Sequence, residues 1–159
     1  MYLHLLRHAH AGDPAAWDGP DAARPLSAKG REQADRLGAF LAGVDFSPDA
    51  IVSSPKVRAR ETAQIVADRL DLRVVIDERL AVGLDLAATN DLLVAAGEPQ
   101  RPVLVGHDPD FSDLLATLCG GDAPMRKGAL ARIEIGWPMV AGGGTLRWLI
   151  PPDALRPGR

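Results

Sequence analysis

With 159 residues, 47% of them hydrophobic and 25% charged, the chain has the size and composition of one globular domain, and we expect a single domain over residues 1–159. The formal net charge of -3 argues against a broad nucleic-acid-binding face, and a single cysteine, Cys119, excludes a disulfide within the chain. Because no run approaches the ~18 apolar residues of a membrane span, and the first residues lack the pattern of a signal peptide, we expect a cytoplasmic protein without membrane contact.

The first part of the chain predicts a strand, a loop and a helix. A short apolar run over 2–6 indicates a buried strand, and the glycines and prolines within 9–26 indicate a long loop. A loop of that length in a compact domain is usually functional or disordered. Ser27 can cap a helix that runs to about Gly43, with an inward stripe at helical spacing made of Ala34, Leu37, Leu41 and Val44.

The middle of the chain repeats this alternation. Residues 50–53 predict a strand that leads into a helix, with Ser54 as the N-cap and Pro55 at the first helical position. This helix continues to about Leu70, and its inward positions are Ala59, Ala63, Val66 and Leu70. The segment LRVVID at 72–77 predicts a third strand, and a weaker helical pattern follows over about 88–96, with Leu92, Leu93 and Ala96 inward.

The last part of the chain predicts one more strand and helix, then a hairpin. The strand spans 103–106, and Asp108 can cap a helix that Pro109 opens, with an inner face of Phe111, Leu114, Leu115 and Leu118. Two apolar runs separated by the glycines of 141–144 predict an antiparallel hairpin. The whole pattern predicts an α/β fold: a three-layer sandwich with a mostly parallel mixed sheet, an antiparallel edge hairpin and helices on both faces.

Polar side chains follow three of these predicted strands. Arg7 and His8 end the first strand, Arg58 lies in the second turn of the helix after the second strand, and His107 follows the fourth. Because ligands of open α/β sheets bind at the carboxyl ends of the strands, these groups can converge. Arginine forks suit phosphate oxygens, and a neutral imidazole can attack phosphorus and carry the phosphoryl group. The pattern therefore indicates a phosphate site with a histidine nucleophile.

Four segments resemble the signatures of the histidine phosphatase superfamily, the phosphoglycerate mutase-like family, and stand in its order: LLRHAHAG at 5–12, RPLSAKGREQA at 24–34, SSPKVRARETA at 53–63 and VLVGHDP at 103–109. The resemblance implies that His8 accepts the phosphoryl group and that Arg7, Arg58 and His107 form the phosphate pocket. It places Arg24 at the pocket entrance. It also implies a mixed sheet with flanking helices, and a reaction that needs no metal or other cofactor.

Within this superfamily the chain resembles the bacterial SixA-type phosphohistidine phosphatases in its compact length, its Arg-Pro-Leu-Ser stretch and its terminal hairpin. This branch implies a phosphohistidine on a partner protein as the substrate, and it typically lacks the carboxylic general acid of longer relatives. The leaving imidazole has a pKa near ~6.5 and needs less proton help than an alkoxide. Longer relatives carry this acid in a region that corresponds to about 76–86 here, and this region contains Glu78 and Asp85. If either side chain points into the pocket, small phosphate esters become more plausible substrates.

Two other functions stay open: a phosphatase for small esters such as sugar phosphates, and a non-catalytic module that binds phosphate or a phosphoprotein. The intact set of Arg7, His8, Arg58 and His107 favours an enzyme. His8 and His10 have the spacing of a metal pair in barrel metallohydrolases, but such barrels need about 200 residues or more, so we predict no metal and place His10 at the rim. We expect Asp108 to act as a helix cap, and Trp17 could belong to a mobile lid.

Overall fold

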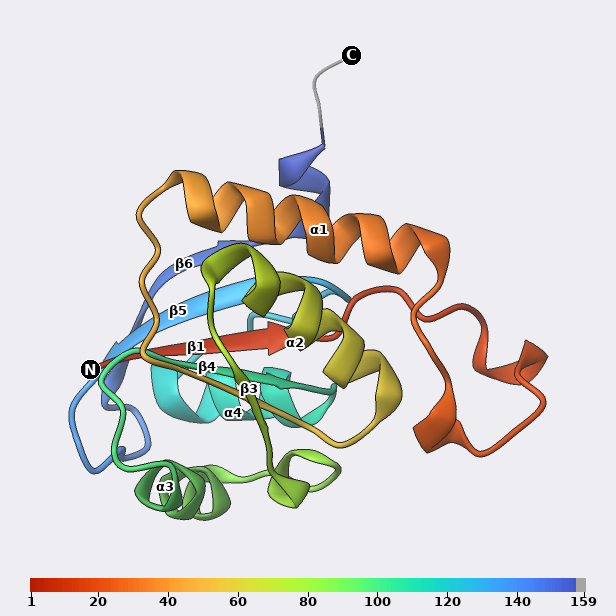
Figure 1. Cartoon of the computed structure of the whole chain (residues 1–159). Helices are drawn as coiled ribbons and strands as arrows, with labels where there is room; N and C mark the ends of the chain where they lie inside the picture. Colours follow the sequence, from red (N-terminus) through yellow and green to blue (C-terminus); the bar gives the residue numbers. More distant parts are fainter. Residues whose placement is uncertain (157–159) are drawn as a thin grey trace.

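A six-stranded mixed sheet organises the chain, in the order β3-β2-β4-β1-β5-β6 (Figure 1). The computed structural model describes residues 1–156, and its strands are β1 (Tyr2–Arg7), β2 (Ala50–Ser53), β3 (Val74–Ile76), β4 (Pro102–Gly106), β5 (Leu130–Ile135) and β6 (Gly144–Ile150). The pairs β1/β4, β2/β4 and β2/β3 are parallel, whereas β1/β5 and β5/β6 are antiparallel. The predicted sheet, with its antiparallel hairpin at one edge, is confirmed.

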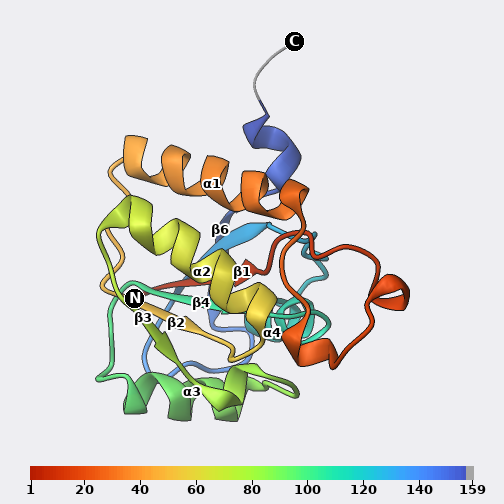
Figure 2. The same ribbon diagram turned by 45° about the vertical axis from the view of Figure 1, so that its right-hand side comes forward.

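Two helices cover each face of the sheet (Figures 1 and 2). They are α1 (Ala28–Gly43) and α2 (Val57–Leu70) on one face, and α3 (Leu86–Ala95) and α4 (Asp110–Cys119) on the other. Successive strand residues alternate between the two cores, as strand geometry requires. Leu5 packs into the core beneath α3 and α4, and Leu6 packs into the core beneath α1 and α2. The three-layer sandwich predicted from the sequence is therefore present.

The start of α2 differs from the prediction. The helix begins at Val57 with Lys56 as its N-cap, rather than at Pro55 with Ser54 as the cap. The Ser54 hydroxyl is engaged elsewhere, because its oxygen lies 2.7 Å from Nε2 of His107 and accepts the N–H of Lys56 at 3.3 Å. This serine therefore connects β2 to β4 instead of capping a helix.

Two other helix boundaries are shifted by one or two residues. Helix α4 begins at Asp110 with Pro109 as its N-cap, yet Asp108 still accepts the first-turn N–H of Ser112 at 3.3 Å. Helix α3 begins at Leu86, because Asp85 caps it by accepting the N–H of Ala88 at 2.8 Å. Residues just past a helix end leave its inward stripe, so two predicted inward residues are exposed: Val44 after α1 and Ala96 after α3.

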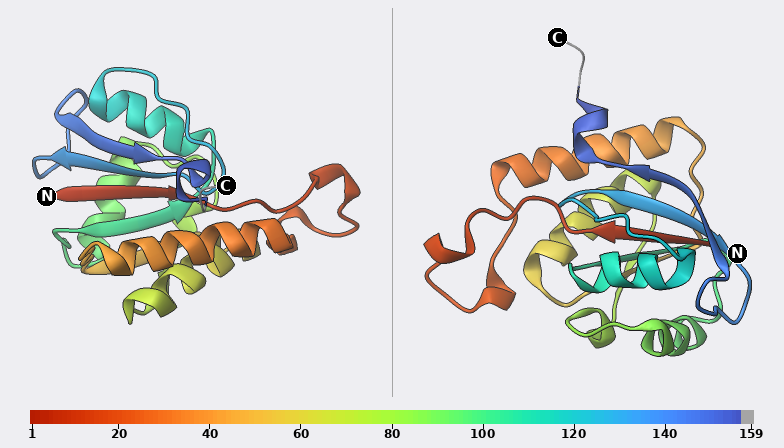
Figure 3. Two further views of the ribbon diagram at one scale, coloured as in Figure 1. Left: turned by 90° about the horizontal axis from the view of Figure 1, so that it is seen from above. Right: turned by 180° about the vertical axis from the view of Figure 1, so that it is seen from behind.

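The predicted loop 9–26 projects from the carboxyl end of β1 and carries two short 3₁₀ helices, η1 (Pro14–Ala16) and η2 (Asp21–Ala23) (Figure 3). Both ends of the loop are fixed to the helical layer. The N–H of Ala9 donates to Oγ1 of Thr62 at 3.1 Å, and the N–H of Ser27 donates to the carbonyl of His10 at 3.0 Å. Among residues 1–156, no helix has both the length and the apolar character needed to cross a bilayer.

Gly30 generates a stability prediction, because a Cβ at this position of α1 would overlap the carbonyl oxygen of His10. We expect Gly30→Ala to lower the free energy of unfolding by about 1–3 kcal/mol, since the loop backbone must shift to accept the methyl group. Gly43→Ala is the matched control, because a Cβ there meets no heavy atom within 4 Å. Urea unfolding followed by circular dichroism measures both variants, and equal stability of the two would contradict the close contact.

Candidate active site

The parallel pairing of β1 with β4 brings the two predicted site histidines together. Arg7 lies opposite Gly106 in this register, so His8 and His107 leave the sheet at adjacent positions. The backbone N–H of His8 donates to the carbonyl of Gly106 at 2.9 Å, and the two imidazole centroids are 5.2 Å apart. The charge of Arg58, in the first turn of α2, acts on both rings. The structure therefore gathers the four residues predicted from separate segments.

His8 is buried and held in one tautomer. Its Nδ1 lies 2.7 Å from the carbonyl oxygen of Ala9, which can only accept, so Nδ1 carries the proton and Nε2 keeps its lone pair. Burial lowers the pKa of His8 to about 3, and the charges of Arg58, Arg7 and Lys127 act in the same direction. The ring is therefore neutral at physiological pH, with a lone pair on Nε2 that can attack an electrophile.

His107 presents its other ring nitrogen. Its Nε2 lies 2.7 Å from Oγ of Ser54, whose hydrogen can be donated because the oxygen already accepts the N–H of Lys56. Nδ1 then carries the proton and is buried without a partner. The pKa of His107 is lowered to about 3, mainly by burial and also by the neighbouring His8 and Arg58. His107 is a neutral hydrogen-bond donor in this arrangement.

The two site arginines are held by oxygens on one side and keep free donors on another. Arg58 donates from Nη1 to the carbonyl of Asp21 at 2.8 Å and from Nη2 to its carboxylate at 2.9 Å. Arg7 donates from Nη1 to the carbonyl of Met125 at 2.6 Å, with Asp108 at 3.4 Å. The Nε atoms of both arginines are buried and have no partner. Each guanidinium is thus fixed in place by its oxygen partners, and its Nε is left unpaired.

Unpartnered donors are concentrated at this site. Within residues 1–156, four buried side-chain nitrogen or oxygen atoms have no hydrogen-bond partner, and three of them belong to this group: Arg7 Nε, Arg58 Nε and His107 Nδ1. The fourth is Nε of Arg36 on α1. An unpaired buried donor costs about 1–3 kcal/mol. Three such donors on residues beside His8 suit an anion with several oxygens, which a phosphoryl group provides.

Arg24 lies where the loop returns to the site, and it is buried. It donates from Nη1 to the carbonyl of Ala11 at 2.6 Å and from Nη2 to the carboxylate of Asp21 at 3.2 Å. Asp21 therefore joins Arg24 to Arg58, a role that no sequence motif indicated. Partial burial raises the pKa of Asp21, but the hydrogen bonds and charges of Arg58 and Arg24 outweigh it and hold that pKa below its usual range.

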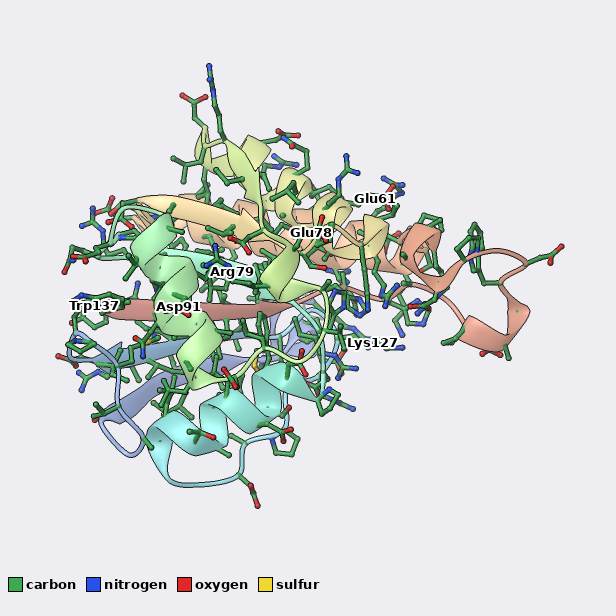
Figure 4. All side chains as sticks on the ribbon, turned by 90° about the horizontal axis from the view of Figure 1, so that it is seen from below. Glu61, Glu78, Arg79, Asp91, Lys127 and Trp137 are labelled. Atoms are coloured by element: carbon green, nitrogen blue, oxygen red, sulfur yellow. The ribbon has the colours of Figure 1, made fainter. Side chains whose placement is uncertain are left out.

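Lys127 is a second site neighbour that the sequence reasoning missed. It precedes β5, whose antiparallel pairing with β1 returns the chain to the end of β1. The N–H of Gly128 fixes this segment by donating to the carbonyls of Arg7 at 3.1 Å and His8 at 3.0 Å. Burial lowers the pKa of Lys127, and so do the charges of Arg7, Arg24 and Arg58. The antiparallel direction of the predicted hairpin could have indicated that Lys127 lies near the end of β1. Figure 4 labels this residue.

The two predicted general-acid candidates make no contact with the phosphate-site residues. Asp85 serves as the N-cap of α3. Glu78 begins the 3₁₀ helix η3 (Glu78–Leu80) after β3, and it is exposed (Figure 4). In the described part of the chain, neither carboxylate forms a hydrogen bond or ion pair with Arg7, His8, Arg58 or His107.

The remaining candidates lie on the loop side of the site. His10 is half-buried at the rim, with Nδ1 2.7 Å from Oγ of Ser27. Trp17 is exposed and its indole donates to the carbonyl of Pro20 at 3.0 Å, while its proposed role in a lid stays a prediction. Over residues 1–156, no group of three or more His, Cys, Asp or Glu side chains is arranged to hold a metal ion.

The chain is similar to known phosphatases in sequence and in fold. Residues 3–81 match the family model described as histidine phosphatase superfamily (branch 1). The chain is similar to the phosphohistidine phosphatase SixA of Escherichia coli K12, at 29% identity over 98% of this chain and 97% of that protein. It is 28% identical to an 8-oxo-(d)GTP phosphatase of Mycolicibacterium smegmatis over 94% of this chain and 48% of that protein. The solved structure of the protein histidine phosphatase SixA complexed with tungstate has a TM-score of 0.85, at 25% identity over 98% of this chain and 100% of that one.

The low pKa values of His8 and His107 lead to a prediction about acid titration. We expect neither ring to take up a proton between pH 8 and pH 5, since both pKa values are about 3 in the folded protein. In the unfolded chain both histidines titrate near ~6.5. The free energy of unfolding therefore keeps their full contribution above that pH and loses it as the pH falls toward 3. The loss is up to ~1.4 kcal/mol per pH unit for each histidine.

Histidine ring resonances measured by NMR test this expectation, and single histidine-to-glutamine variants assign the signals. A resonance of His8 or His107 that titrates between pH 6 and 7 would contradict the burial argument.

Proposed function

The chain belongs to the histidine phosphatase superfamily, and from this premise we propose that His8 forms a covalent phosphohistidine and that the substrate is a phosphohistidine on a partner protein. One observation carries the proposal. Three unpartnered buried donors belong to Arg7, Arg58 and His107, whose charges or ring act beside the neutral His8 imidazole, and Nε2 of that imidazole keeps its lone pair. Tungstate, present in the SixA structure that this fold matches, is a tetrahedral oxyanion like phosphate and supports an oxyanion site of this kind.

In the first step, Nε2 of His8 attacks phosphorus while the bond to the leaving nitrogen breaks, and the substrate ring, protonated on its other nitrogen, departs as a neutral imidazole. The donors of Arg7, Arg58 and His107 hold the phosphoryl oxygens in line. The His8 ring gains positive charge as the new bond forms, and the Ala9 carbonyl stabilises that charge by accepting the Nδ1 proton in a hydrogen bond. In the second step, water attacks the phosphorus of phospho-His8, and inorganic phosphate and neutral His8 are released. The route uses no metal ion or organic cofactor.

The substrate class follows from the proton demand of the leaving group. A phosphohistidine releases an imidazole, whose pKa near ~6.5 allows it to leave with little help from an acid. An alkyl ester needs a proton donor, and neither Glu78 nor Asp85 contacts the four site residues. The similarity to SixA, a phosphohistidine phosphatase by name, supports the same choice. The similarity to an 8-oxo-(d)GTP phosphatase keeps a small phosphorylated substrate as the second candidate.

The covalent step predicts the behaviour of His8→Asn. We expect this variant to lose roughly 10³-fold or more in kcat on a phosphohistidine peptide, because the nucleophile is removed. Vanadate binding should stay within a few-fold of the parent protein, since Arg7, Arg58 and His107 remain. Quenching a ³²P-labelled reaction in alkaline detergent, in which phosphohistidine persists, should trap label on the parent and none on the variant. Turnover that survives in a correctly folded variant, checked by thermal melting, would rule out the covalent route.

The leaving-group argument predicts a substrate preference. In a chelating buffer, we expect kcat/KM for a phosphohistidine peptide to exceed that for a panel of sugar phosphates by about 100-fold or more, because the alkoxide needs a proton donor and the two carboxylates at the site, Asp21 and Asp108, are paired with Arg58 and Arg7. Glu78→Gln and Asp85→Asn should leave the peptide rate within about twofold. A preference for a sugar phosphate that either substitution reduces would assign the protein to small esters, and anion binding without any turnover would assign it to the binding modules.

A further inference from the structure

A second group of cations lies beside the phosphate site. It surrounds a pocket of about 340 Å³, called the basic pocket here, whose cationic and titratable lining is Arg7, His10, Lys29, Arg126, Lys127 and Arg156. Arg7 therefore belongs both to the basic pocket and to the proposed phosphate site. We propose that the basic pocket binds a second anionic group of the substrate. Under the proposed function, on which this inference rests, that group is an acidic side chain near the phosphohistidine of the partner protein.

The charge of the basic pocket is unusual for this chain. Five arginines and lysines line it with a single carboxylate, Asp153, although the whole chain has a net charge of -3. Asp153 pairs with Arg126 at 3.3 Å and with Arg156 at 2.8 Å. Within residues 1–156, Lys29 and Lys127 form no ion pair. Uncompensated positive charge in a concave surface attracts anions.

Lys127 links the basic pocket to the site of chemistry. The N–H of Gly128 is bonded to the carbonyls of both Arg7 and His8, which fixes the lysine backbone at the end of β1. The charges of Arg7, Arg24 and Arg58 reach the Lys127 ammonium, and together with burial they lower its pKa. Arg7 lines the basic pocket and also belongs to the proposed phosphate site, so an anion held in the pocket can belong to the same substrate as the phosphoryl group.

The outer cations suit a protein partner better than an enclosed small molecule. The Arg126 side chain is 71% exposed and that of Arg156 is 55% exposed. Pockets for small ligands bury most of the ligand surface, whereas exposed charges at the rim of a protein interface steer and orient the partner. An acidic side chain close to the phosphohistidine would meet this rim as the phosphoryl group enters the site.

The test uses two phosphohistidine peptides that differ only in having aspartates or asparagines beside the phosphorylated residue. We expect the parent protein to have a KM about tenfold lower for the acidic peptide at low salt, and this difference should shrink as ionic strength rises. In Lys127→Met/Arg126→Gln, the KM for the acidic peptide should rise about tenfold, so that the difference in KM between the two peptides disappears.

The matched control is Arg73→Gln/Arg101→Gln, which removes the same amount of positive charge from two exposed residues. These residues lie just before the parallel strands β3 and β4, so they are at the amino ends of the strands, whereas the site is at the carboxyl ends. The control should keep the preference for the acidic peptide. Equal losses of kcat on both peptides in the pocket variant would mean that Lys127 acts on the transferred phosphoryl group, and an unchanged preference would mean that the pocket does not contact the substrate. Either result overturns the proposal.

A second substrate pair separates this inference from the proposed function. Phenyl phosphate and 4-carboxyphenyl phosphate differ by one carboxylate and contain no phosphohistidine. If the peptides are not hydrolysed but the carboxylated ester is preferred, and this preference is lost in Lys127→Met/Arg126→Gln, the second anion subsite stands and the phosphohistidine substrate fails. If the peptides are hydrolysed and neither pair shows a charge preference, the proposed function stands and the subsite fails.

Discussion

The register between β1 and β4 is the constraint on which the rest of the site depends. Parallel pairing of Arg7 with Gly106 places the residue after each strand at the same height, and the bond from His8 N–H to the Gly106 carbonyl extends the ladder by one step. A slip of one residue would turn every side chain of β1 to the opposite face. The hydrophobic alternation of Leu5 and Leu6 between two cores opposes such a slip, so the buried cores set the catalytic geometry.

The two histidines of the candidate site are neutral, and the arginines beside them are positively charged. Burial suppresses the protonated forms of His8 and His107, while the cationic arginines beside them are held by backbone carbonyls and by the carboxylates of Asp21 and Asp108. A protonated imidazole has no free lone pair, so the same desolvation that costs stability in acid would keep His8 able to act as the nucleophile that we propose. Donors left unpaired in the folded chain are a typical sign that local stability is exchanged for ligand recognition.

The sequence predicts the alternation of strands and helices, the inward stripes of the helices and the convergence of the four main site residues, because strand ends and helix stripes follow from periodicity. The sequence does not show which of several possible partners a polar side chain binds. Ser54 has the sequence signature of an N-cap, but its hydroxyl is hydrogen-bonded to His107 in the structure. Asp21 lies in an aperiodic loop, and its link between Arg24 and Arg58 needs coordinates. Lys127 could have been placed by noting that a hairpin strand antiparallel to β1 must start beside its end.

The anchoring of loop 9–26 at both ends has a consequence for how such a protein diversifies. Thr62 and the carbonyl of His10 fix the points where the chain departs and returns, so residues between them can be exchanged as a unit without moving the nucleophile. Doubling the length of a flexible loop costs only about 0.6 kcal/mol of closure entropy. Insertions here are thus an inexpensive evolutionary route to new substrate ranges, provided that an arginine-bridging carboxylate is retained.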